Sequence, residues 1–185
     1  MLRFKAFLIG IGLLTLTACT DQANINYAWL SSYYTQDVVR YAARDRSMLV
    51  IVHGDFGIPI KQASAEIAKN LNLPGWFEPV QFVAASPSAA PREHRFVFVI
   101  NPTNATLSGR HACAATKPLP SGQFSQNVKV VGAFCAGDEV VSELTATGVG
   151  GFAGDSKFRP KFLAFLNNMI DELVPARLIY VPSGN

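Results

Sequence analysis

Recognisable metal sites are missing from this sequence. It contains only three histidines and three cysteines, and none of them shows the short spacing of a metal site, such as His-x-x-x-His, His-Glu-x-x-His or Cys-x-x-Cys. A metal ion needs several such ligands within a few ångströms of one another. We therefore expect no metal, and no motif in the chain calls for another cofactor.

A long apolar run is missing as well. Ala6 to Leu16 is apolar but well short of the roughly 20 residues that a membrane-spanning helix needs. Two cations, Arg3 and Lys5, precede this run and the small pair Thr17-Ala18 follows it, which is the pattern of a cleaved secretion signal. We expect residues 1–18 to be removed and the mature chain to contain no transmembrane helix.

The end of this signal, Leu16-Thr17-Ala18-Cys19, resembles the lipobox of bacterial lipoproteins. The resemblance covers residues 1–19 and implies that Cys19 receives a diacylglycerol thioether and becomes the acylated N-terminus after cleavage. Two or more acyl chains, such as palmitate, anchor a protein stably, because each buried CH₂ contributes about 0.8 kcal/mol. The alternative is an ordinary secretion signal with a chance cysteine at position 19.

The residue after the cysteine bears on the choice of membrane. In lipoproteins, an Asp in that place tends to retain the protein in the inner membrane. Here Thr20 occupies the place, and Asp21 comes one residue later. The resemblance therefore implies a lipid anchor in the bacterial outer membrane, with the protein on its periplasmic face.

The chain has little net charge once the signal is removed. The full chain carries 16 Lys and Arg against 13 Asp and Glu, and the loss of Arg3 and Lys5 reduces the formal net charge from +3 to +1. A chain so close to neutral gives no reason to expect a nucleic-acid partner. Its length and apolar content suit one globular domain with a hydrophobic core.

With Cys19 assigned to the lipid by the resemblance, Cys113 and Cys135 remain as an even pair. Disulfides persist in the oxidising compartment that a secretion signal implies. We therefore predict a Cys113–Cys135 disulfide, which would pin the long Asn101–Gln126 loop. Free structural thiols, or a reactive cysteine, are the alternatives.

Residues 19–26 are predicted to be a short polar linker, and residues 27–185 a single α+β domain, with α/β as the alternative class. Apolar patterns indicate strands at 48–52, 80–84, 94–100, 127–135 and 139–147, the last two as a hairpin, with 177–181 as a candidate for one more. Helical spacing is found at 36–44, from 59 or 60 to Pro74 with Ile60 on the apolar face, and from about 157 to Pro175. Together these patterns predict a mixed, mostly antiparallel sheet of about five strands with helices packed on it.

Aromatic side chains gather near the start of the domain, at Tyr27, Trp29, Tyr33 and Tyr34. Because Trp and Tyr favour the membrane–water interface, one interpretation is a membrane-interface belt. The interpretation that the pattern favours is an amphipathic helix that packs its aromatic face on the core, because the stretch runs into helical spacing at 36–44.

His53 and Asp55 are weak candidates for a catalytic pair, and no residue is assigned as catalytic. They follow the strand at 48–52, and open sheets bind ligands at such strand ends, where a carboxylate can orient a histidine base. The stretch resembles the oxyanion loop of α/β-hydrolases, but Asp55 replaces a glycine of that loop and the chain has no Gly-x-Ser-x-Gly elbow. The favoured interpretation is a turn in which glycine supplies a positive φ and Asp55 an Asx turn.

Gly148–Gly154 stands between a predicted strand and a predicted helix, which is the context of a phosphate-binding loop. The spacing does not fit such a loop, because Ala153 stands where a dinucleotide loop needs glycine. A flexible connector is the favoured interpretation.

The leading hypothesis is a lipid-anchored, non-enzymatic envelope protein that binds an envelope protein, a lipid or a glycan. The alternative is a periplasmic hydrolase or transferase that uses His53 and Asp55 with help from the Asn101–Gln126 loop. A third is a small-ligand binder that uses Gly148–Gly154. The segments His53–Gly57 and Ala133–Gly137 are similar to those of bacterial envelope proteins of uncharacterised function, a likeness that implies no activity.

Overall fold

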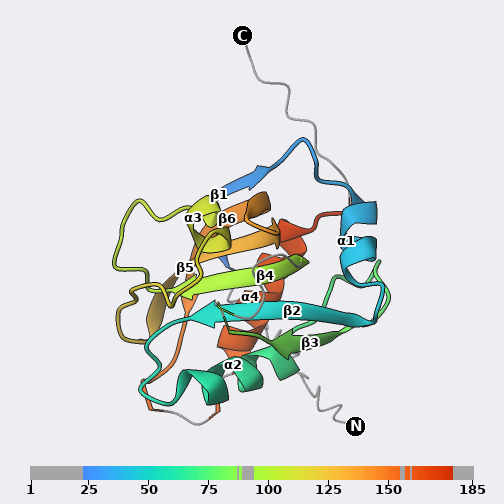
Figure 1. The fold of residues 1–185 in the computed structure, drawn as a ribbon. Helices are drawn as coiled ribbons and strands as arrows, with labels where there is room; N and C mark the ends of the chain where they lie inside the picture. Colours follow the sequence, from blue (N-terminus) through green and yellow to red (C-terminus); the bar gives the residue numbers. More distant parts are fainter. Residues whose placement is uncertain (1–22, 87, 89–93, 155–156, 159, 177–185) are drawn as a thin grey trace, which may run out of the picture.

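One six-stranded mixed sheet organises the part of the chain that the computed structural model describes, namely residues 23–86, 88, 94–154, 157–158 and 160–176 (Figure 1). The α+β class is confirmed, with six strands in place of about five. The elements in this part are β1 (Asn24–Leu30), α1 (Gln36–Ala42), β2 (Ser47–His53), α2 (Ile60–Lys69), β3 (Gln81–Ala84), β4 (His94–Ile100), α3 (Gly109–Cys113), β5 (Asn127–Ala136), β6 (Glu139–Val149) and α4 (Pro160–Leu173).

The strand order is β1-β6-β5-β4-β2-β3. β2 pairs in parallel with β3 and β4, while β4, β5, β6 and β1 pair antiparallel in turn. β2 and β4 lie inside the sheet, which explains why their sequences are apolar at both odd and even positions. The β5–β6 hairpin turns through Gly137, whose φ of +62° suits the first central position of a type II′ turn.

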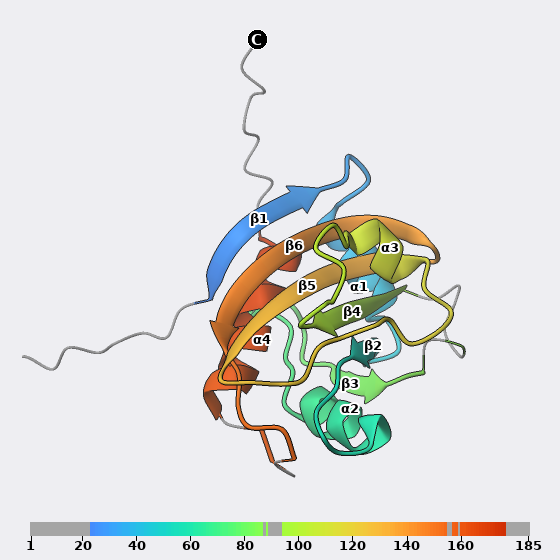
Figure 2. The ribbon, with the colours of Figure 1, turned by 90° about the vertical axis from the view of Figure 1, so that its left-hand side faces the viewer.

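The two faces of the sheet are covered unequally, as Figure 2 shows by placing α4 and α3 on opposite sides of the strands. The larger core lies on the side of α1, α2 and α4, where Phe96, Phe98 and Phe134 of the sheet meet the apolar residues of α4. A smaller core, built around Ile51, Val97, Val99, Val131 and Ala133, lies beneath α3 and the segment before β5. The fold is therefore a sheet with one thick and one thin cover.

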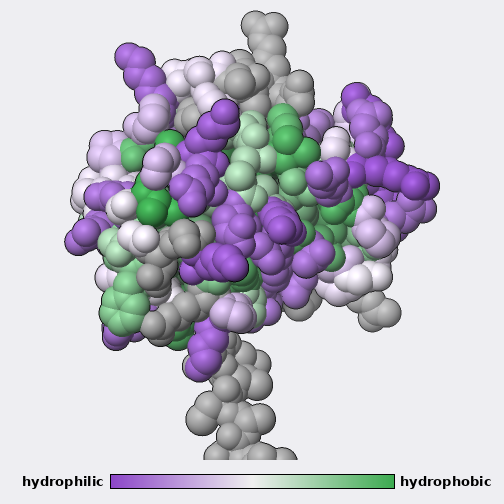
Figure 3. Space-filling model, turned by 90° about the horizontal axis from the view of Figure 1, so that it is seen from below, coloured by the Kyte–Doolittle hydropathy of each residue, from purple (hydrophilic) through white to green (hydrophobic). Residues whose placement is uncertain are grey.

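The two longer helices follow their predicted patterns. α4 begins at Pro160 instead of about residue 157, and buries Phe162, Phe165, Leu166, Met169, Ile170 and Leu173 on one face. α2 buries Ala63, Ser64, Ile67 and Ala68, but Ile60 is exposed, contrary to prediction, because it lies in the first turn and has helical neighbours on one side only. Figure 3, which shows the molecule from below, has mostly hydrophilic residues across the middle of the view and hydrophobic ones toward its sides.

The predicted aromatic helix near the start of the domain is wrong. Residues 24–30 form β1, an edge strand paired with β6, and its first three residues were predicted to belong to the linker. Tyr27 is 50% exposed and Trp29 is 40% exposed, while Tyr34 is buried and its hydroxyl donates a hydrogen bond to the carbonyl of Pro175 (2.8 Å). An edge strand can keep aromatic side chains exposed on its open face, so the aromatic residues of this stretch did not mark a helix that packs on the core. The candidate strand at 177–181 and the signal at 1–18 lie outside the described residues.

The Asn101–Gln126 loop contains α3, a helix of five residues that the sequence pattern did not predict. The Cys113–Cys135 disulfide is confirmed, and it joins α3 to β5 with 5.6 Å between the Cα atoms. It is fully buried at both ends, so it fixes the thin cover to the sheet from inside. The disulfide therefore holds the Asn101–Gln126 loop to the sheet, as predicted.

We expect the double substitution Cys113→Ala with Cys135→Ala to lower the free energy of unfolding by about 3 kcal/mol, because the bond closes a loop across a sequence separation of 22 residues. Urea unfolding at equilibrium measures this. A reducing agent should destabilise the natural protein by a similar amount and leave the double variant unaffected. Equal stability of the two oxidised proteins would contradict the prediction.

Candidate functional site

The turn after β2 contains both predicted catalytic candidates, and it places them in different surroundings. Asp55 is exposed, and its Oδ1 atom accepts a hydrogen bond from the backbone N–H of Gly57 (3.1 Å), which has a φ of +69°. This is the Asx turn that the sequence predicted. His53, the last residue of β2, is only 3% exposed and lies under the Asn101–Gln126 segment.

His53 is held as a neutral imidazole. Its Nδ1 atom accepts a hydrogen bond from the backbone N–H of Leu119 (3.0 Å), so the ring proton is on Nε2. Nε2 is buried and has no hydrogen-bond partner among the described residues. Burial lowers the pKa of His53 to about 4, because the imidazolium would lose its hydration. The ring is therefore uncharged near neutral pH.

The Asn101–Gln126 segment covers this strand end through several contacts. Besides the Leu119 contact, the backbone N–H of Phe124 donates to the carbonyl of Asp55 (2.7 Å), and Gln123 forms a bridge with Asp55. A substrate could reach His53 only if the segment moved away. The catalytic role of His53 and Asp55 stays a prediction, and their observed contacts are those of a structural turn.

The glycine-rich segment connects β6 to α4, as predicted, and backbone hydrogen bonds tie it to neighbouring segments. The backbone N–H groups of Gly150, Gly151 and Gly154 donate to the carbonyls of Gln126 (2.7 Å), Ser125 (3.0 Å) and Phe56 (2.6 Å). A phosphate loop needs such N–H groups free to bind its ligand. A Cβ atom on Gly150 would lie 2.1 Å from the carbonyl oxygen of Ser125, so this glycine permits a close backbone approach.

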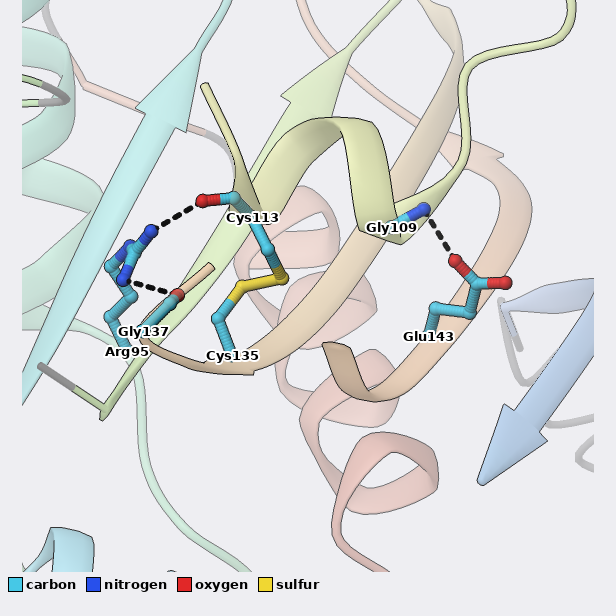
Figure 4. The surroundings of a disulfide bond; sticks show 6 residues. All are labelled: Arg95, Gly109, Cys113, Cys135, Gly137 and Glu143. Carbon is cyan, nitrogen blue, oxygen red and sulfur yellow. Dashed lines mark hydrogen bonds between the residues drawn. A yellow bond between two sulfur atoms is a disulfide. The ribbon is translucent and has the colours of Figure 1, made fainter. Parts of the chain in front are cut away.

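Two charged residues that hold the thin cover were missed by the sequence analysis. Arg95, buried on β4, donates from Nη2 to the carbonyl of Cys113 (2.5 Å) and from Nη1 to that of Gly137 (2.9 Å), as Figure 4 shows beside the disulfide. Burial lowers the pKa of Arg95, although Asp138 acts in the opposite direction. Glu143 on β6 accepts hydrogen bonds from the N–H of Gly109 and from the Tyr27 hydroxyl. The sequence signal for Arg95 was a cation next to the apolar run Phe96–Ile100 of the same strand.

A surface groove of about 450 Å³ lies between the end of α1 and the segment before β3, and its lining includes Arg40, Arg44, Arg46, Trp76, Phe77 and Glu78. Two of these arginines have acidic neighbours: Arg40 pairs with Asp37 (2.9 Å), and Arg44 lies 3.7 Å from Asp45. With Glu78 in the lining, the cations are balanced locally. The groove therefore lacks the charge excess that would select an anion.

The described residues contain no cluster of three His, Cys, Asp or Glu side chains that could hold a metal ion. Within the same part of the chain, no helix is long and apolar enough to cross a membrane. Compared with models of protein families, with curated proteins and with solved structures, the chain gives no match.

Gly150→Ala should lower the free energy of unfolding by about 3 kcal/mol, because its Cβ would overlap the Ser125 carbonyl and the adjacent backbone would have to move. Gly75→Ala is the matched control: no atom lies within 4 Å of the position that its added methyl group would take, and we expect a change within about 0.5 kcal/mol. Thermal and urea unfolding of both variants would measure this. A Gly150→Ala protein as stable as the control would contradict the packing argument.

We expect His53 to make stability depend on pH between about 4 and 6.5. Above this window the ring is neutral in both states. Within this window the unfolded chain binds a proton on His53, because its pKa there is the ordinary 6.5. The folded ring does not bind this proton, because its pKa is about 4. Stability should therefore fall by about 2 to 3 kcal/mol from pH 7 to pH 4.5 and change little from this source below pH 4.

His53→Gln should remove this part of the pH dependence, since glutamine does not titrate. The quantity to compare is the loss of unfolding free energy between pH 7 and pH 4.5 in the two proteins. Burial and the charge of Arg44 also lower the pKa of His94, so His94 contributes to the pH dependence of both proteins. The contribution of His53 is therefore the difference between the two losses of unfolding free energy. The same loss in both would show that His53 is not buried as a neutral ring.

Proposed function

We propose that this chain is a lipid-anchored envelope protein that serves as a non-enzymatic binding or structural module at the periplasmic face of the bacterial outer membrane. The observation that carries the proposal is the lipobox-like Leu16-Thr17-Ala18-Cys19, which follows a cationic and apolar signal. Acylation of Cys19 would tether the mature protein to a bilayer for its lifetime.

The distance between this cysteine and the folded part of the chain supports the proposal. β1 begins at Asn24, only five residues after Cys19. Five residues span at most about 17 Å in any conformation. A domain on so short a tether would stay beside the membrane surface, where it could meet envelope proteins, lipids or glycans.

The Cys113–Cys135 disulfide also supports an extracytoplasmic location. Structural disulfides form and persist in oxidising compartments such as the bacterial periplasm, and they are rare in the reducing cytosol. This bond is buried and joins two secondary-structure elements, as expected of a structural disulfide and not of a catalytic one.

The side chains around His53 favour a binding or structural module over an enzyme. A general base must reach a proton on its substrate, and here the imidazole is buried beneath Leu119. The carboxylate of Asp55 accepts a bond from its own turn and does not orient the ring through any described contact. Neither side chain is poised to act on a ligand from solution.

Cys19→Ser should abolish acylation and release the protein from the membrane fraction, because serine cannot form the thioether. Mass spectrometry of the N-terminal peptide and fractionation of the envelope would test this. Thr20→Asp is the matched control: it should keep the acyl chains and move the protein to the inner membrane. An unmodified Cys19 in the mature protein would refute the proposal.

A further inference from the structure

We propose that the exposed aromatic face of β1 docks on the lipid headgroup region of the membrane, so that the domain rests on the bilayer by this edge of its sheet. We call this surface the β1 aromatic face; it consists of Tyr27 and Trp29 of β1 with Thr145 and Thr147 of β6. The inference rests on the proposed function, since the acyl chains on Cys19 would bring this edge to the membrane.

The strand register gathers these side chains on one side of the sheet. Tyr27 pairs with Thr145, and Trp29 pairs with Glu143, so their side chains point to the same face. The neighbouring residues Ala28 and Leu30 pair with Leu144 and Ser142, which face the larger core. Of the β1 residues, Ile25 and Leu30 pack against the larger core, while Ala28 stays exposed at the open edge of the sheet. The two aromatic side chains lie on the opposite face of the strand from Leu30.

The face has the chemistry of a membrane interface. Two large aromatic side chains remain about half exposed, although each could bury a large apolar area. Trp and Tyr combine an apolar ring with a polar tip, and they are enriched where lipid meets water. Thr145 lies opposite Tyr27 and Thr147 lies opposite Asn24 on the neighbouring strand, and their uncharged hydroxyl groups can hydrogen-bond to headgroups.

The charges around the face suit a bilayer with anionic lipids. Glu143 is the one acidic residue within β1 and the part of β6 paired with it, and it is occupied by the Gly109 N–H and the Tyr27 hydroxyl. The nearby charges on the same side of the sheet are cations: Arg110 is exposed on α3, and Lys129 of β5 pairs with Thr147. Cations beside an aromatic surface favour contact with anionic headgroups.

The short segment between Cys19 and Asn24 would bring the lipid anchor closer to the β1 edge of the sheet than to the β3 edge. Cys19 precedes Asn24 by five residues, and Trp29 follows Asn24 by five strand residues, or roughly 17 Å. The sheet order places β1 at one edge and β3 at the other (Figure 1). Acyl chains held beside the start of β1 would therefore present the β1 edge, and not the β3 edge, to the lipid.

The chain supplies a matched probe of this orientation in its two tryptophans. Trp29 lies on the β1 aromatic face, and Trp76 lies in the segment before β3, next to the opposite edge of the sheet. Their exposures are similar, at 40% and 47%. Trp76→Phe leaves Trp29 as the single tryptophan, and Trp29→Phe leaves Trp76.

The experiment reconstitutes each acylated mature variant into vesicles that contain brominated phospholipids, which quench tryptophan at the membrane. We expect the fluorescence of Trp29 to fall by about twofold or more relative to unbrominated vesicles, and that of Trp76 to stay nearly unchanged. Addition of Tyr27→Ser and Thr145→Asp to the Trp29 protein should reduce the quenching. Matched circular dichroism spectra would show that the variants are folded.

Three outcomes would overturn the inference. If the acylated protein binds vesicles and neither tryptophan is quenched, the domain does not dock on the bilayer. The proposed lipid anchor is unaffected by that result. Equal quenching of both tryptophans means that no edge is preferred. Protection of Trp29 from an aqueous quencher, without quenching by lipid, means that a second copy or another protein covers the face. Loss of the acyl chains, seen by mass, would instead count against the proposed function.

Discussion

The attachment of α3 to the sheet is the contact on which the thin cover depends. α3 has only five residues, which is too short for a helix to be stable by itself. Three bonds hold it in place: the Cys113–Cys135 disulfide, the Arg95 contact with the Cys113 carbonyl, and the Glu143 contact with the Gly109 N–H (Figure 4). Together they let a segment with little apolar surface of its own shield Val97, Val131 and their neighbours from water.

The same cover determines the chemistry of the strand end beneath it. Because Leu119 lies over His53, the ring is excluded from water and kept neutral, and the bond from Leu119 fixes its tautomer. Nε2 is buried and has no partner among the residues that the structure describes, and a buried donor without a partner costs about 1–3 kcal/mol. A histidine at a strand end is therefore, in this chain, a packed core residue with an acid-sensitive contribution to stability.

The sequence predicted the elements whose patterns depend on burial alone. β2 and β4 are apolar at both odd and even positions because both faces are covered, and α4 shows a full apolar stripe because one face packs on the sheet. β1 and α3 were not predicted because an edge strand keeps aromatic residues in solvent and a five-residue helix has no measurable period. At the candidate site, the Asx turn at Asp55 was predictable from local residue types. The burial of His53 under Leu119 and the roles of Arg95 and Glu143 were not, since each depends on a partner 18 or more residues away.

The position of β1 has a consequence for the order in which the sheet can be completed. β1 belongs to the first part of the domain to be synthesised, yet its partner is β6, and the Tyr27–Glu143 contact spans 116 residues of sequence. The hairpin of β5 and β6 forms from segments that are adjacent in sequence. β1 cannot pair until β6, near the end of the chain, has been synthesised. The first strand of the domain to leave the ribosome is thus among the last to find its place, and its aromatic residues remain uncovered throughout that interval.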